Sequence, residues 1–301
     1  MPRGTRPYVE NHNTISGVTP GSPSTIDVPV LPGIVHAHDW EYAESGTPAT
    51  RAVMEAGLEK IEILLNNGSW SEYLVTDILK MNDFYGHTFV DGFLTQFFTD
   101  DTRESAYDAE KTAFVPGGHR NPKFRVYVKG SATLPTLKSR LLVEGLTDAG
   151  RATLATNPAK SVRPLIKHDV DTLTLTNSGG TPTKITYPLT SDVRSLNFEG
   201  ADITAIVINV NGVEKYTFTS LARLNEMLKQ SRAVAVPQAD TWHINFELLG
   251  GSIDGIYRPG YAPNGQSFNA LDEVQFEIYS SSTNSVRLLM EVYDTPKTRL
   301  E

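Results

Sequence analysis

The sequence predicts an all-β protein with two tandem eight-stranded antiparallel jelly rolls, each with a short helix between strands. The first observation is a strand, tight turn, strand and helix over residues 202–229, where an apolar β-branched run precedes Asn211-Gly212. The second is that residues 61–80 repeat this order around Asn67-Gly68. The third is that the other strands are short and do not alternate with helices, which favours two packed antiparallel sheets per half.

The helix in each half is predicted from a cap and a periodic apolar face. Ser220 is a typical N-cap, and the apolar side chains between residues 221 and 228 recur at helical spacing. In the first half we expect Thr76 or Asp77 to cap the corresponding helix.

Further strand-like stretches occur in both halves in the same order, and this indicates a structural duplication. They are residues 25–30 and 184–189 (TIDVPV and KITYPL), 38–41 and 195–199, 124–128 and 274–279, and 140–144 and 287–291 (RLLVE and RLLME). We expect the turns Asn67-Gly68 and Asn211-Gly212 to lie at matching hairpin tips.

The alternation of side chains along these strands predicts the core. In residues 242–249 it turns His243 outward. The expected core residues of the second half are Ile206, Ile208, Phe246, Leu248, Phe276, Ile278, Leu288 and Met290, and their counterparts in the first half are Ile63, Leu65, Phe124, Val126, Leu141 and Val143.

Composition changes predict the boundaries of the two halves. Residues 1–24 are rich in Pro, Gly, Ser, Thr and Asn without a hydrophobic period, and the stretch after residue 146 has neither a strand nor a long helix pattern. We therefore expect an extended arm at 1–24, a first roll at 25–146, a linker at 147–169, a second roll at 170–295 and a tail at 296–301.

Composition also limits the function. The chain has 301 residues, of which 39% are hydrophobic, so it is long enough for two packed domains. A net charge of −8 without a basic block argues against nucleic acid as the main partner. The absence of cysteine excludes disulfides and thiolate chemistry. No apolar run is long enough to span a membrane, and the N-terminus lacks the apolar core of a secretion signal.

Two histidines raise the question of a metal site. His36 and His38 are expected on one face of a strand because side chains repeat every two residues. With Glu41 nearby, they resemble part of the metal-binding signature of cupin enzymes. Ile34 and Trp40 share that face, which favours the border of a packed sheet instead, and a metal site needs further donors.

The acidic segment 100–110 is the second candidate cation site. It lacks the alternation and glycine of an EF-hand loop, so a solvated loop is favoured over Ca²⁺. We expect no catalytic, cofactor or metal residues, with a structural Ca²⁺ ion as the open alternative.

Aromatic and basic side chains give the candidate contact sites. The segment 84–98 is rich in aromatic residues, which at this density are typical of a core or a subunit interface, and 250–269 is long for a connection. The candidate inter-subunit residues are Phe89, Phe93, Phe97, Tyr257, Tyr261 and Phe268. Arg3 and Arg6 in the arm are candidates for contact with a membrane or a neighbouring subunit.

Taken together, the pattern resembles that of the double jelly-roll major capsid proteins of tailless icosahedral phages with an internal membrane. It is similar to the corticoviruses most closely and to the tectiviruses more distantly. The resemblance is carried by residues 205–228, 242–249 and 274–293, and extends over residues 25–295 through the internal symmetry.

This resemblance implies a structural protein and not an enzyme. It implies a homotrimeric capsomer with a pseudo-hexagonal outline, whose rolls stand perpendicular to the shell above a lipid bilayer. The implied partners are other copies in the capsid lattice, penton and minor capsid proteins and the membrane surface, without sequence-specific binding of nucleic acid. The implied location is the virion, after assembly in the host cytoplasm.

Two other classes of protein stay open at this point. A two-cupin metalloenzyme also has duplicated β-barrels, but Arg194 and Leu196 occupy the positions that match the histidine pair, and no GxSxG, phosphate loop or HExxH occurs. A carbohydrate-binding β-sandwich or spike protein is the other, with Tyr257, Tyr261 and Phe268 as its exposed aromatic residues.

Overall fold

The chain folds into two compact units in the computed structural model, one of residues 1–166 with 295–301 and one of residues 167–294. The structure describes residues 8–11, 15, 17–28, 33–99, 112–157, 162–176, 180–187, 192–231, 235–246, 248–249, 273–294 and 296. Among these residues, no helix is both long and apolar enough to cross a membrane.

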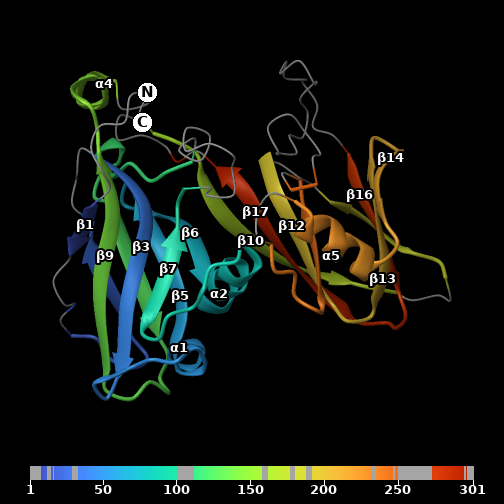
Figure 1. The fold of residues 1–301 in the computed structure, drawn as a ribbon, viewed down its shortest axis with the longest axis horizontal. Coiled ribbons are helices and arrows are strands. Elements are labelled where there is room, and N and C mark those ends of the chain that lie inside the picture. Colours follow the sequence, from blue (N-terminus) through green and yellow to red (C-terminus); the bar gives the residue numbers. More distant parts are fainter. Residues whose placement is uncertain are drawn as a thin grey trace. The chain divides into compact units, whose positions relative to one another are not determined.

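The first unit is a sandwich of two antiparallel sheets (Figure 1). Its strands are β1 (Tyr8–Asn11), β2 (Pro23–Asp27), β3 (Gly33–Glu44), β4 (Thr47–Pro48), β5 (Leu58–Leu65), β6 (Gly68–Leu74), β7 (Phe93–Phe97), β8 (Lys123–Val128) and β9 (Pro135–Gly145). Its helices are α1 (Arg51–Gly57), α2 (Val75–Phe84), the 3-10 turn η1 (Pro116–Gly118) and α4 (Asp148–Thr156). One sheet has the order β1-β9-β3-β4, with β7 also paired to β3, and the other has the order β2-β8-β5-β6.

The second unit contains two four-stranded sheets. Its strands are β10 (Leu165–Thr174), β11 (Thr183–Tyr187), β12 (Asp192–Glu199), β13 (Ile203–Val210), β14 (Val213–Phe218), β15 (Thr241–Asn245), β16 (Val274–Ser280) and β17 (Ser285–Asp294), and its helix is α5 (Leu221–Lys229). The sheet orders are β10-β17-β12-β15 and β11-β16-β13-β14.

The two units have the same strand order. Strands β1, β9, β3 and β7 of the first unit correspond to β10, β17, β12 and β15, and β2, β8, β5 and β6 correspond to β11, β16, β13 and β14. In both units a helix follows the hairpin, α2 after β6 and α5 after β14. This order is that of a jelly roll, so the predicted duplication and fold are confirmed; the two-residue strand β4 is the addition in the first roll.

The first roll begins earlier than expected. Strand β1 lies within the predicted arm and pairs with β9, with Tyr8 opposite Val143 and Asn11 opposite Arg140. The prediction of an extended arm is therefore wrong for residues 8–11. The strand is only four residues long, too short for an alternating pattern, and backbone pairing at the sheet edge sets its structure.

The predicted linker also contains regular structure. Helix α4 is capped by Thr147, whose hydroxyl accepts a hydrogen bond from Gly150 N at 3.1 Å, and Leu154 is its one buried residue. One buried apolar side chain in a helix leaves no periodic signal in the sequence. Strand β10 then begins at Leu165, inside the same segment.

The hairpin tips match, but one residue earlier in the first roll than expected. Asn66 and Asn67 have positive φ angles of 54° and 68°, whereas Asn211 and Gly212 have 52° and 74°. Asn67 therefore corresponds to Gly212, and Gly68 is the first residue of β6. Asparagine tolerates the left-handed region better than most residues, so Asn-Asn forms the same turn as Asn-Gly.

The predicted helix cap is correct in the second roll only. Ser220 caps α5, and its hydroxyl accepts a hydrogen bond from Arg223 N at 3.3 Å. Helix α2 begins at Val75 after Leu74 without a side-chain cap, so the assignment of Thr76 or Asp77 is wrong. It starts directly where β6 ends, and its apolar face packs against the core of the first roll.

The predicted core is confirmed with one exception. Thirteen of the fourteen expected side chains are buried, and the exception, Leu248, is half-buried because it follows the end of β15 at Asn245. The first roll has one continuous apolar cluster between its sheets, in which Trp40, Tyr42 and Phe124 are among the largest side chains.

Candidate functional site

The recurring motif RLLxE forms two cross-strand polar contacts in each roll, one through its arginine and one through its glutamate. Its arginine reaches a glutamate of the neighbouring strand: Arg140 Nη2 lies 2.5 Å from Glu41 Oε2, and Arg287 Nη1 lies 2.6 Å from Glu199 Oε1. The duplication therefore extends from the strand order to the charged side chains on the outward face of the sheets.

The glutamate of the motif reaches a bulge residue. The pairing of β3 shifts between Val35 and Ala37, and that of β12 shifts between Val193 and Ser195, so His36 and Arg194 are the extra residues at matching places. His36 Nε2 lies 3.2 Å from Glu144 Oε2, and Arg194 Nη1 lies 3.2 Å from Glu291 Oε1.

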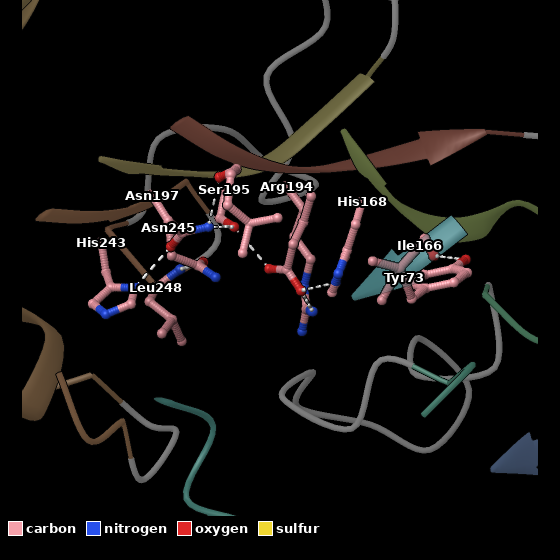
Figure 2. Close-up of polar contacts among 11 residues, drawn as sticks. Tyr73, Ile166, His168, Arg194, Ser195, Asn197, His243, Asn245 and Leu248 are labelled. Atoms are coloured by element: carbon pink, nitrogen blue, oxygen red, sulfur yellow. Dashed lines mark hydrogen bonds and ion pairs between the residues drawn. The ribbon is translucent and has the colours of Figure 1, made fainter. Parts of the chain in front are cut away.

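The second roll builds a buried polar network around this pair (Figure 2). Glu291 also accepts a hydrogen bond from Ser195 Oγ at 2.7 Å. Asn197 Nδ2 donates to Ser195 Oγ at 3.0 Å, and its Oδ1 accepts a hydrogen bond from His243 Nδ1 at 2.7 Å. All five side chains are buried, which is typical of a network that specifies structure.

The prediction that His243 turns outward is wrong. All residues of β15 are buried, including Thr241, His243 and Asn245, so both faces of this strand are covered. The alternation in the sequence distinguishes an apolar face from a polar one, but a polar side chain can be buried when it forms a hydrogen bond, as His243 does with Asn197.

His36 and His38 do not share a face. The bulge breaks the alternation, so His36 lies beside Glu144 on the outward face, whereas His38 Nε2 lies 2.6 Å from Ser139 Oγ and its ring packs 4.4 Å from that of Phe124 in the core. The histidine pair of the cupin comparison is therefore not assembled. No group of three metal-ligating side chains occurs in the described part of the chain.

Glu41, the third member of that comparison, belongs to the outward charges. Its carboxylate lies 2.6 Å from Lys138 Nζ in addition to Arg140. The hydrogen bond from Lys138 and the two positive charges lower the pKa of Glu41 although its partial burial opposes the shift.

The aromatic segment forms a depression on the surface of the first roll. The depression has a volume of about 300 Å³. It is lined by Asp39, Leu79, Asn82, Asp83, His87, Thr88, Phe89, Val90, Phe93, Thr95 and Phe97, which come from β3, α2, β7 and the connection between α2 and β7. The three predicted contact residues Phe89, Phe93 and Phe97 are thus brought together, and each is half-buried.

Neighbouring side chains fix the rings of this depression. The rings of His87 and Phe97 stack with centroids 4.1 Å apart, and the Arg140 guanidinium carbon lies 5.2 Å from the centroid of Phe93. Asn82 Nδ2 donates to the carbonyl of Thr95 at 2.8 Å, which ties α2 to β7. The aromatic wall is therefore held in place before any partner binds.

The other predicted contact residues are outside the described residues. They are Arg3, Arg6, Tyr257, Tyr261 and Phe268. The acidic segment 100–110, the candidate Ca²⁺ site, is also outside the described residues. Their assignments stay predictions.

Sequence reasoning missed several residues of the depression. Asp39, Asn82, His87 and Val90 carry no motif, and their proximity depends on how β3, α2 and β7 pack.

Comparison with known proteins agrees with this architecture. Residues 9–143 match the family model of the viral coat protein P2 N-terminal domain. No curated protein sequence matches the chain.

Solved structures match over nearly the whole chain. The major capsid protein P2 of bacteriophage PM2 is similar with a TM-score of 0.74 and 14% identity, covering 97% of this chain and 98% of that one. The major capsid protein of STIV gives a TM-score of 0.62 with 12% identity, covering 97% and 98%. The PBCV-1 virus capsid gives 0.61 with 10% identity, covering 99% and 96%.

These likenesses define the class: the chain has the double jelly-roll fold of these viral capsid proteins. Within it, residues 9–143 match the model of the viral coat protein P2 N-terminal domain, and this match includes most of β1. The match of residues 9–143 and the likeness in fold agree with the resemblance to double jelly-roll capsid proteins that the sequence indicated.

Proposed function

We propose that the chain forms homotrimeric capsomers with a pseudo-hexagonal outline, which tile an icosahedral shell over an internal membrane. The observation that carries the proposal is that both units have the same strand order and the same cross-strand ion pairs. Each chain contributes two similar rolls, so a trimer has six similar flanks. A ring with six flanks can tile a hexagonal lattice.

The half-buried aromatic residues of the first roll support a subunit interface. Phe89, Phe93 and Phe97 gather on one surface beside Val90, which is 57% exposed. Aromatic side chains are enriched at the centres of interfaces. We expect the trimer contacts to bury well over the roughly 2,000 Å² at the low end of permanent interfaces.

The N-terminal arginines are proposed to contact the membrane or a neighbouring capsomer. Each of Arg3 and Arg6 would contribute about 1 kcal/mol near an anionic lipid surface. Because Tyr8–Asn11 pairs with β9, the arm to be deleted is residues 2–7. The truncated chain is expected to fold and to form trimers, but to assemble poorly on anionic vesicles; unchanged assembly would remove the role of the arm.

The partners and place of assembly follow from the same proposal. The shell would also contain penton and minor capsid proteins, and it would assemble in the host cytoplasm. Sequence-specific binding of nucleic acid is not part of it, since the net charge is −8.

Electron microscopy of the purified chain tests the proposal. Negatively stained particles are expected to show threefold averages with a hexagonal outline. Monomers, or rings with another symmetry, would overturn it. The deletion of residues 2–7 serves as the matched variant, because it leaves both rolls intact and should give the same averages.

A further inference from the structure

The depression on the first roll lies beside the edge strand of a sheet. Strand β7 pairs with β3 on one side, and no other strand of the described residues pairs with it. Its side chains Phe93 and Phe97 are half-buried and line the depression together with Phe89. Three aromatic rings at an open sheet edge form a surface suited to a partner.

One carboxylate in this depression has no basic partner among the described residues. Asp39 accepts a hydrogen bond from Thr95 Oγ1 at 2.7 Å, and this is its one side-chain contact within that part of the chain. The second carboxylate, Asp83, lies 2.6 Å from Arg51 Nη1 and is thereby neutralised. The nearby Glu41 takes both Lys138 and Arg140. Asp39 is therefore a carboxylate of the depression without an ion-pair partner among the described residues, although Arg140 lies opposite it in the pairing of β3 with β9.

We propose that the depression receives a basic side chain from a second copy of this chain. Asp39 is the counter-ion of the incoming guanidinium or ammonium group, and the rings of Phe89, Phe93 and Phe97 line its site. Arg140 already lies over one face of Phe93, and His87 over one face of Phe97. A cation that touches both a carboxylate and aromatic faces gains ion-pair and cation–π attraction, and both gain strength when water is excluded.

A second copy is the occupant for two reasons. The proposal rests on the trimeric capsomer, in which other copies are the nearest neighbours. The chain also presents suitable cations: Arg120 and Lys215 are exposed and form no ion pair with other described residues. The charge of the depression and the charge on these residues are complementary.

The test measures self-association of the purified full chain by sedimentation velocity on dilution. Asp39→Asn removes the charge but keeps an oxygen to accept the Thr95 hydrogen bond, so the roll should fold as before. We expect the dissociation constant of the oligomer to rise about tenfold, since an interfacial charge loses its partner. Asp39→Glu should retain part of the affinity.

Two further variants separate this effect from a change in folding. Asp91→Asn neutralises an exposed carboxylate that does not line the depression, and it should leave association unchanged. Val90→Glu adds a charge at a rim position that is already exposed, so it should weaken association without lowering the melting temperature.

The outcomes are distinguishable. If the wild-type chain associates and Asp39→Asn matches it, the inference is overturned while the trimeric capsomer stands. An occupant from the same chain, or from a different virion protein, would give this same result. If the wild-type chain does not associate, the proposed capsomer fails, and the inference fails with it.

Discussion

Replacing Phe124 by alanine tests the packing of the first roll most severely. The side chain is 1% exposed, and its ring lies between the two sheets. The centroid of the ring lies 4.4 Å from that of His38, 5.9 Å from that of Trp40, 5.8 Å from that of Phe114 and 6.0 Å from that of Phe98. Loss of about 150 Å² of buried apolar surface costs about 4 kcal/mol at 25 cal/mol/Å². This agrees with the range of about 3–5 kcal/mol for such truncations.

Hydrogen exchange followed by mass spectrometry is the appropriate assay, because the chain has two units and a single unfolding transition is not assured. Exchange should accelerate in peptides from β5, β8 and β3, and much less in β13 and β16. Val213→Ala is the control, since its side chain is 57% exposed and the change should stay within about 0.5 kcal/mol. A destabilisation below about 1 kcal/mol for Phe124→Ala would refute the reasoning.

Three further predictions concern the hairpin tips, the buried glutamate contacts and the ion pairs of Glu41. Gly212→Ala should lower the free energy of unfolding by about 1–2 kcal/mol, because the φ angle of Gly212 is +74°. Gly68→Ala should raise it by about 0.4–1 kcal/mol, because the φ angle of Gly68 is not positive and there is space for a Cβ atom. Equal effects of the two substitutions in urea denaturation would contradict the assignment of the hairpin tips. Arg194→Met removes the guanidinium from the buried Glu291 and should lower the free energy of unfolding by about 3–5 kcal/mol. His36→Met should lower it by less, because the His36 side chain is 15% exposed. Thermal melting compares the two losses, and a larger loss for His36→Met would refute the network. Because the pKa of Glu41 is lowered, its ion pairs stabilise the fold fully above the ordinary pKa of 4.5, and this contribution is lost as the pH falls through the lowered pKa. Glu41→Gln should therefore lower the free energy of unfolding by about 0.2–1 kcal/mol at neutral pH and leave it unchanged in strong acid. A difference between the two proteins that does not depend on pH would count against the ion pairs.

The parts of the fold that the sequence predicted are those with a strong local signal. The hairpin β13–β14, the helix after it and the recurring motif RLLxE each have turn, cap or alternation patterns, and their repetition established the duplication. The core followed from the same alternation, because most side chains that face the second sheet are apolar.

The features that sequence reasoning missed depend on contacts between distant segments. Strand β1 exists because β9 offers its edge, and no pattern in four residues signals this. The bulges at His36 and Arg194 reverse the face of the neighbouring residues, which a strict alternation cannot anticipate. The depression around Phe97 brings together β3, α2, β7 and the connection between α2 and β7, so its carboxylate and rings have no common motif.

The central claim is that three chains, each with two similar rolls, form the capsomer. Size-exclusion chromatography with light scattering measures it most directly on the purified chain at micromolar concentration. We predict one species with three times the chain mass of 33.1 kDa. A single monomeric species that persists as the concentration rises would contradict the account.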